Sequence, residues 1–442
     1  MPSLSRVVLP AATWLRRNTS AQALTRTRNN ELGHSPAGGT GGFCERNRIN
    51  ETGQIEGHSN AAARSRAFPW NADGLLRYSL AAALLLASIT VYATDWTVTD
   101  LGVLPGDLRS TGRDINNAGQ ILGESLEVEN FQYHPVIYHN GQVTDTGTLN
   151  GEEVRAWRMN NAGQIVGSAR NGNVTHAVHY QNGKWADLGI GPNSEAFGIN
   201  DAGQIVGNLN TGGGSQRGFL YQNGKVTDLG TLGGLYTRVN AINNVGQVVG
   251  GSTTASGEFH GFIYQNGKMT DLGTLPGGVL SEAYDINDAG KVVGHSFAPN
   301  GPFHAFVYEN GTMTDINPSA LEGSSGMAVN NLGAVILFGK EPPYTTLSFF
   351  LHQGGIITNL SELPAFTKDG WTLEGLSSIN DLGQIVGQGV TSSSRTKFDS
   401  QALLFTPVPE PSQWLMLWLG LGLLIVRGGG RWRFGKAGCR AK

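Results

Sequence analysis

The chain has 442 residues, of which 64 are glycine and only 15% are charged. This composition, without a long amphipathic helical pattern, is typical of many short strands joined by tight turns and excludes a helical bundle. The hydrophobic share of 39% is enough to form a buried core and excludes a disordered polymer.

The net charge of -3 hides a strong segregation along the chain. Residues 94–409 carry 15 basic against 28 acidic residues, a net of -13, whereas residues 1–93 carry 10 against 5 and residues 410–442 carry 6 against 1. An acidic central body repels phosphate backbones, so we expect no nucleic-acid partner. The two cysteines, Cys44 and Cys439, lie outside this body, which therefore needs no disulfide.

The first apolar segment is SLAAALLLASITVYA, residues 79–93, which follows Arg77 and ends in a small-x-small pattern. Its length and flanks are typical of a secretory signal. We expect a signal peptide over residues 75–93 with cleavage between Ala93 and Thr94; a buried core helix is the alternative. No methionine occurs between Met1 and Met159. We therefore expect residues 1–74 to be a mis-called or remnant extension, with translation starting near Leu75 or Leu76.

One nine-residue stretch recurs seven times, at spacings of 40 to 50 residues. Its copies are INNAGQILG, MNNAGQIVG, INDAGQIVG, INNVGQVVG, INDAGKVVG, VNNLGAVIL and INDLGQIVG. Two further elements recur in phase with it, an apolar stretch such as HAFVYENG and a polar one such as KVTDLG. Regular self-similarity of this length indicates a repeat architecture.

The turn residues indicate how one unit is built. In NDAGQ the first Asn and the fourth Gly suit a type I turn followed by a left-handed glycine. In YQNGKV the Asn-Gly pair is the strongest short signal for a two-residue hairpin. One unit is then four strands, ending at IN and containing QIVG, HAF and TDLG, in an antiparallel meander.

Seven such units predict an all-β, seven-bladed β-propeller over residues 94–406. The series begins at Trp96 with the fourth-strand element alone, WTVTDLG, and ends near Thr406 with the third. We therefore expect the N-terminal strand to complete the last blade and close the ring, leaving no open sheet edge. An open solenoid is the rival, but its ends would need capping repeats and neither end has one.

The units resemble the HAF repeat, a family of extracellular bacterial repeats, through motifs such as His304-Ala305-Phe306. The resemblance covers roughly residues 96–406, and copies six and seven depart from it most. It implies an extracellular location and carries no reaction or ligand. An eighth copy, INETGQIEGHSNAAARSRAF at residues 49–68, precedes the expected signal peptide and supports the doubt over residues 1–74.

The C-terminus, residues 407–442, contains Pro409-Glu410-Pro411, then an apolar run at 414–426, then Arg427, Arg431 and Arg433. This order resembles the PEP-CTERM sorting signal of Gram-negative bacteria. The resemblance implies a short transmembrane helix in the inner membrane and recognition by an exosortase. Basic residues after an apolar run stay in the cytoplasm, so the body would lie outside. The run of 13 residues is shorter than the roughly 17–25 of a stable span.

Most repeated polar residues are expected to be structural. Asp201, Asp288 and Asp381 lie in the INDAG-type turns, where a calcium loop would need more oxygens. The histidines of the third strands recur at one position, which favours packing over metal ligation; they are His134, His176, His260 and His304. Asp100, Asp228 and Asp271 of the TDLG elements are expected to bond to backbone at a strand end.

Function is expected to come from residues that do not repeat. No G-x-S-x-G, H-E-x-x-H or Walker motif occurs in the chain, so we predict no enzyme, no cofactor and no metal. The predicted role is structural or binding, in the cell envelope or extracellular matrix, with an extracellular polysaccharide or other surface proteins as partners. The alternative is a polysaccharide lyase or hydrolase that uses acids such as Glu152 and Glu153. Candidate residues for stacking on an extracellular polysaccharide are Tyr133, Trp157, Tyr344 and Trp371.

Overall fold

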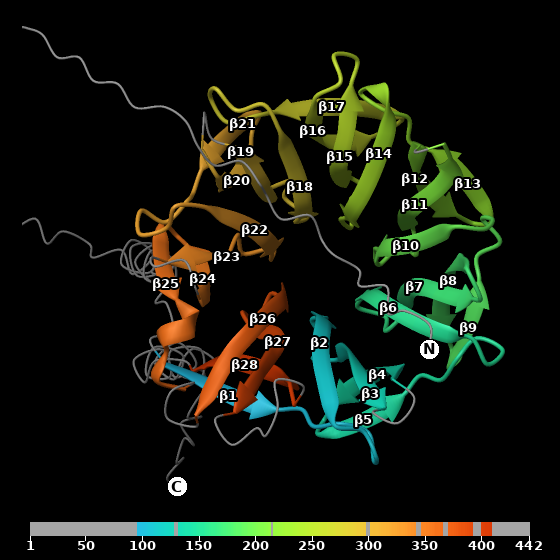
Figure 1. Ribbon diagram of the computed structural model, residues 1–442, viewed down its shortest axis with the longest axis vertical. Helices are drawn as coiled ribbons and strands as arrows, with labels where there is room; N and C mark the ends of the chain where they lie inside the picture. Colours follow the sequence, from blue (N-terminus) through green and yellow to red (C-terminus); the bar gives the residue numbers. More distant parts are fainter. Residues whose placement is uncertain are drawn as a thin grey trace, which may run out of the picture. The chain divides into compact units, whose positions relative to one another are not determined.

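The computed structural model describes residues 95–127, 131–213, 215–297, 301–341, 346–365, 370–391 and 399–408. Within these residues, seven four-stranded antiparallel sheets surround one axis as the blades of a propeller (Figure 1). The predicted seven-bladed β-propeller is therefore confirmed. The expected extension, the expected signal peptide with its cleavage site, and residues 409–442 lie outside the described part of the chain.

Blades 1 to 3 each use four strands in chain order. Blade 1 consists of β2 (Arg109–Ile115), β3 (Ile121–Glu127), β4 (Gln132–His139) and β5 (Gln142–Asp145). Blade 2 consists of β6 (Glu153–Met159), β7 (Ile165–Asn171), β8 (Val174–Gln181) and β9 (Lys184–Asp187). Blade 3 consists of β10 (Ser194–Ile199), β11 (Ile205–Gly212), β12 (Ser215–Gln222) and β13 (Lys225–Asp228).

Blades 4 to 6 repeat this order, and blade 7 departs from it. Blade 4 consists of β14 (Gly233–Ile242), β15 (Val248–Thr254), β16 (Phe259–Gln265) and β17 (Lys268–Gly273). Blade 5 consists of β18 (Ser281–Ile286), β19 (Val292–Phe297), β20 (Phe303–Glu309) and β21 (Thr312–Asp315). Blade 6 consists of β22 (Ser324–Val329), β23 (Val335–Glu341), β24 (Thr346–Gln353) and β25 (Ile356–Asn359), followed by the short 3-10 helix η1 (Leu360–Glu362). Blade 7 combines β26 (Trp371–Ile379), β27 (Ile385–Thr391) and β28 (Gln401–Val408) with β1 (Asp95–Asp100).

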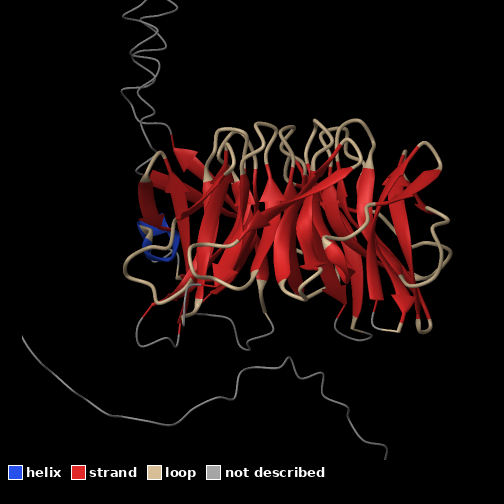
Figure 2. Cartoon of the chain, turned by 90° about the horizontal axis from the view of Figure 1, so that it is seen from above, coloured by secondary structure: helices blue, strands red, loops and turns tan. Residues whose placement is uncertain are grey.

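Both predicted turns form as their residues require. In blade 3 the N–H of Gly203 donates to the carbonyl of Asn200 at 3.0 Å, and Gly203 has a φ of 72°. The second hairpin has Asn223 at φ 51° and Gly224 at φ 77°, the left-handed pair that a two-residue type I′ turn needs. Figure 2 shows the strands running between the two faces of the ring, with loops at both ends.

The last glycine of the repeated stretch permits a close approach of the first two strands. A Cβ on Gly207 would collide with the carbonyl oxygen of Glu195, and one on Gly294 with that of Glu282. Blade 6 has Leu337 at this position, and Leu337 stands opposite Gly326. The sixth copy, which departs from the repeat, thus still forms its sheet with a glycine on the partner strand.

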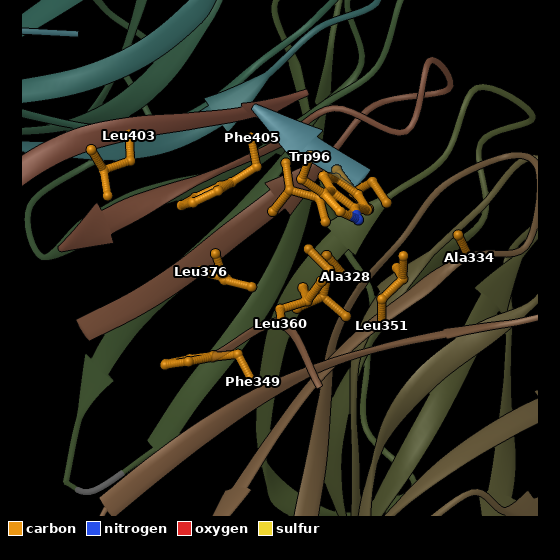
Figure 3. Close-up of a cluster of buried hydrophobic side chains, with 12 residues drawn as sticks. Trp96, Ala328, Ala334, Phe349, Leu351, Leu360, Leu376, Leu403 and Phe405 are labelled. Carbon is orange, nitrogen blue, oxygen red and sulfur yellow. The ribbon is translucent and has the colours of Figure 1, made fainter. Parts of the chain in front are cut away.

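The core is divided among the blade interfaces. Among the residues that the structure describes, seven clusters of buried hydrophobic side chains each combine residues of two adjacent blades. The cluster between blades 6 and 7 contains Trp96, which is 6% exposed, with Phe349 and Phe405 (Figure 3). Strand β1 pairs with β28 from Asp95↔Val408 to Asp100↔Leu403. The predicted closure of the last blade by the N-terminal strand is therefore confirmed.

In the part of the chain that the structure describes, no helix is long and apolar enough to span a bilayer. The transmembrane helix expected at residues 414–426 lies outside that part.

Candidate functional site

The repeated turns of all seven blades meet around the axis at one face of the ring. The first Asn of each turn donates its side-chain N–H to the backbone carbonyl of its counterpart in the next blade, at 2.8 to 3.2 Å, and all are 3 to 5% exposed. We call these residues the Asn ring: Asn116, Asn160, Asn200, Asn243, Asn287, Asn330 and Asn380. The last hydrogen bond runs from Asn380 to Asn116, so the ring closes on itself.

A second ring lies one residue further along each turn. Each of its backbone N–H groups donates to the side-chain oxygen of the next member at 2.8 to 2.9 Å. We call these residues the turn ring: Asn117, Asn161, Asp201, Asn244, Asp288, Asn331 and Asp381. The three carboxylates are each flanked by amides, which supply N–H donors and keep like charges apart. The aspartates of the INDAG turns therefore serve to join the blades.

The other repeated polar residues form pairs on the outer strands. The aspartates of the TDLG elements accept a backbone N–H two residues on, as in Gly230 N–H to Asp228 at 2.8 Å, which agrees with the prediction for this motif. The histidines of the third strands lie beside aspartates of the fourth, at 2.7 to 3.6 Å; the pairs are His134–Asp145, His176–Asp187, His260–Asp271 and His304–Asp315. Among the described residues, no three His, Cys, Asp or Glu are grouped so as to hold a metal ion.

The main candidate site is a cavity of about 700 Å³ on the axis. The first strand of every blade, which lies nearest the axis in Figure 1, carries a β-bulge two residues before its copy of the repeated stretch. A bulge leaves one residue without a partner and re-aims its side chain. We call the seven residues skipped by the pairing the bulge ring, and all of them line the cavity; they are Arg113, Trp157, Phe197, Asn240, Tyr284, Met327 and Ser377.

Aromatic and aliphatic side chains form most of the cavity wall. The ring centroids of Trp157 and Phe197 are 5.8 Å apart, and Phe303, Phe338 and Leu347 add carbon surface from blades 5 and 6. Phe303 is the first residue of β20 and pairs with the last of β19, at the strand ends remote from the repeated turns. The cavity thus opens on the face opposite to the Asn ring.

Three charged residues, Asp114, Arg158 and Asp285, line a second, smaller cavity of about 180 Å³ together with the Asn ring and the turn ring. Arg158 lines the axial cavity as well. Asp114 accepts hydrogen bonds from the N–H of Met159 at 2.8 Å and from the hydroxyl of Ser378 at 2.7 Å. Arg158 lies 3.6 Å from Asp114. Asp285 accepts the N–H of Val329 at 2.8 Å. Burial raises the pKa of Asp285 to about 6, the charge of Asp114 adds to this effect, and Arg158 opposes it.

Asp285→Asn is expected to stabilise the protein in a pH-dependent way. Because burial holds the pKa of Asp285 above its unfolded value of about 4, its contribution to stability is complete below that value and is lost as the pH rises through about 6. The Asn side chain keeps an acceptor for Val329 and cannot ionise. We expect a gain of about 2 kcal/mol in the free energy of unfolding at pH 8 and almost none at pH 4. Urea denaturation at both pH values measures this, and equal changes at the two would contradict it.

The residues predicted for polysaccharide stacking are not brought together. Trp157 lines the axial cavity, with the Arg113 guanidinium 5.1 Å from its ring centroid. Tyr133 is covered by Arg155 at 3.5 Å, and Trp371 packs against the core between blades 6 and 7. Tyr344 lies outside the described residues.

The acids named for the enzymatic alternative are engaged elsewhere. Glu152 accepts the side-chain N–H of Asn171 at 2.7 Å, and Glu153 that of Arg155 at 3.2 Å. Neither lines the axial cavity.

Sequence reasoning missed six of the seven members of the bulge ring. Their signal was nevertheless present, because the position two residues before each repeated stretch holds a different residue in every copy. The non-repeated residues predicted as candidates lie in loops, whereas the variable residues that line the axis lie within the repeating unit.

Comparisons with known proteins find solved structures of low similarity and no relative by sequence. No family model and no curated protein matches the chain. The β-propeller domain of the Trilobed protease from Pyrococcus furiosus has a TM-score of 0.44 and 10% identity over 71% of this chain and 94% of that one. A prolyl endopeptidase has a TM-score of 0.48 and 13% identity, over 77% of this chain and 55% of that one. The lectin of Aleuria aurantia has a TM-score of 0.34 and 12% identity, over 62% of this chain and 97% of that one.

These comparisons correct one prediction. The absence of catalytic motifs led us to predict that the chain is not an enzyme, and this prediction is wrong as it stands, because proteins with similar propellers include peptidases. The chain spans about half the length of the prolyl endopeptidase and of the acylaminoacyl peptidase from Pyrococcus horikoshii, 55% in each case. What the chain shares with them is the propeller.

Proposed function

We propose that the protein is an exported binding protein of the cell envelope or extracellular matrix, and that its axial cavity holds the ligand. The bulge ring is the observation that carries this proposal. The scaffold repeats seven times, while the seven side chains that it presents to the cavity all differ. A cavity of about 700 Å³ falls within the range of sites that bind small molecules, and such sites combine apolar walls with a few polar groups.

The positions of the two ends of the ring support anchoring by the C-terminus. Strand β1 begins where β28 ends, since Asp95 pairs with Val408. Pro407 lies beside Gly383 of the seventh repeated turn. Both ends of the propeller are therefore on the face of the Asn ring, away from the mouth of the cavity. Attachment through residues 409–442 would leave that mouth open to solvent.

Export and sorting rest on the two terminal segments. The apolar run ending at Ala93 supports secretion, with Thr94 as the first residue of the mature protein. The triplet Pro409-Glu410-Pro411 and the basic tail support transient anchoring in the inner membrane and recognition by an exosortase-type enzyme. The resemblance of the propeller units to the HAF repeat agrees with this location.

Met327→Trp tests the binding site by filling the cavity from the bulge ring. Thermal shifts are measured with a panel of aromatic compounds, organic cations and short oligosaccharides, on the wild type, this variant and the control Leu332→Ser. Leu332 is 69% exposed on the opposite face, so its variant should behave as the wild type. We expect compounds that stabilise the wild type to lose most of their effect on Met327→Trp. Shifts that are the same in all three proteins would contradict an axial site.

Fractionation of cells tests the sorting proposal. Replacing Pro409, Glu410 and Pro411 by alanine is expected to leave the protein in the inner-membrane fraction, because an exosortase would no longer recognise it. A distribution identical to that of the wild type would remove the sorting claim and leave the binding site untouched.

A further inference from the structure

The chemistry of the axial cavity defines the class of ligand that it can hold. Only part of each lining residue faces the cavity. The structure also shows which polar atoms of these residues already have hydrogen-bond or ion-pair partners within the protein. Three observations narrow the class: the carbon surface of the aromatic residues, the pairing of the charged ones, and the bonding of the remaining polar groups.

The aromatic residues present carbon rather than polar atoms. The indole nitrogen of Trp157 is shielded from solvent and has no hydrogen-bond partner among the described residues, so the exposed part of Trp157 is its carbon surface. The ring centroid of His295 lies 4.2 Å from that of Phe303 and 5.2 Å from that of Tyr284. Walls of this kind favour another ring, which contacts them in offset or edge-on geometry.

The two arginines that line the cavity are each paired with an acidic residue of the protein. Arg113 donates to Glu124 at 2.6 Å. Arg158 lies 3.6 Å from Asp114. Its positive charge also lowers the pKa of Asp285, so two carboxyl groups face this guanidinium. Glu322 and Lys340 are exposed at the rim and carry one charge of each sign. Inside the rim, an ionic ligand would have to leave water without an unpaired counter-charge to meet it, which is costly in an apolar site.

The side-chain donors of other polar residues in the wall are bonded within the protein. Asn240 donates to Glu282 at 3.0 Å and to the carbonyl of Ala283 at 2.7 Å. The hydroxyl of Ser377 donates to the carbonyl of Gly112 at 2.9 Å. Burial lowers the pKa of His295 to about 4, with Arg238 contributing. His295 is therefore neutral at pH 7 and adds no charge to the wall. Its ring nitrogen Nδ1 lies 3.1 Å from the hydroxyl of Ser325 and is bonded within the protein. A sugar, which needs many hydrogen bonds, would find few free partners.

We infer that the ligand of the axial cavity is a neutral aromatic molecule, bound through carbon contacts with the bulge ring and the neighbouring rings of blades 5 and 6. This inference rests on the proposed function. The chemistry of the cavity thus favours a neutral aromatic ligand over a sugar or an anion.

Matched probes test the inference. N-phenylnaphthylamine and anilinonaphthalene sulfonate share one skeleton and differ in an anionic group; a naphthyl trimethylammonium salt supplies the cation and cellobiose the neutral sugar. We expect the neutral amine to bind the wild type with one-to-one stoichiometry, at least about tenfold more tightly than the other three. Fluorescence and calorimetric titrations measure the affinities.

Met327→Arg provides the matched variant, since it adds an unpaired cation to the cavity wall. It is expected to weaken binding of the amine and to strengthen binding of the sulfonate. The ratio of the two affinities should fall about tenfold or more. Leu332→Ser should change neither affinity. If the sulfonate, the cation or cellobiose binds as tightly as the amine and Met327→Trp abolishes that binding, the inference is overturned and the axial site stands. If binding of every probe is absent or unaffected by Met327→Trp, the proposed function falls with it.

Discussion

Trp96→Ala is expected to lower the free energy of unfolding by about 4 kcal/mol. Trp96 comes from the N-terminal strand β1 and is buried between blades 6 and 7 with Phe349 and Phe405 (Figure 3). Removing a buried Trp side chain costs its transfer free energy and leaves a cavity that the neighbours fill only in part. Because β1 is the strand that closes the ring, the loss falls where the two ends of the propeller meet.

The control for this variant is Thr99→Ala on the same strand. The side chain of Thr99 is exposed, so its loss should change stability by less than about 0.5 kcal/mol. Circular dichroism during urea denaturation follows all three proteins without relying on tryptophan fluorescence. If Trp96→Ala were as stable as Thr99→Ala, closure by β1 would contribute nothing to the fold.

The second large effect is expected at the Asn ring. Asn160 donates to the carbonyl of Asn200 and to the side chain of Gln164, and its own oxygen accepts the N–H groups of Ala162 and Gln164. Asn160→Ala removes all four hydrogen bonds, of which the one to Asn200 is buried and the other three are partly buried. Each lost hydrogen bond of this kind costs about 1 kcal/mol. We expect the free energy of unfolding to fall by about 3 kcal/mol.

The neighbouring residue is the matched control, because Asn161 belongs to the turn ring and is exposed. Asn161→Ala removes a hydrogen bond to Asp201 at 2.8 Å and the acceptor for the N–H of Asn117. Since water replaces both partners at the surface, a loss below about 1 kcal/mol is expected. Similar losses at the two positions would show that the buried ring is not what joins the blades.

The sequence predicted the blades because their signals are local. Left-handed backbone conformations require the residues found at Asn223-Gly224 and at Gly203. A single copy of the repeat is enough to predict turns of this kind. Closure was also predictable, since the strand missing from the last unit stands at Trp96. Conformations of this kind depend on a few neighbouring residues, which is why the number of blades and the order of their strands were correct.

The site was harder to predict because it depends on register. A period-two pattern gives no sign that Trp157 and Phe197 are skipped by the pairing, and a bulge changes which face a side chain occupies. Rotation about the axis then brings together positions more than 40 residues apart, such as Asn116 and Asn160, which are joined over 44 residues. The same rotation explains why Tyr133 and Trp371, chosen for their position in loops, do not meet.

A crystal structure with the tightest-binding compound of the probe panel tests the central claim most directly. The claim is that the seven side chains of the bulge ring form one ligand site on the propeller axis. We predict density for the compound between Trp157, Phe197 and Tyr284, with the cavity mouth opposite the Asn ring. Density confined to the outer strands or to grooves between blades, with the axial cavity unchanged, would contradict the claim.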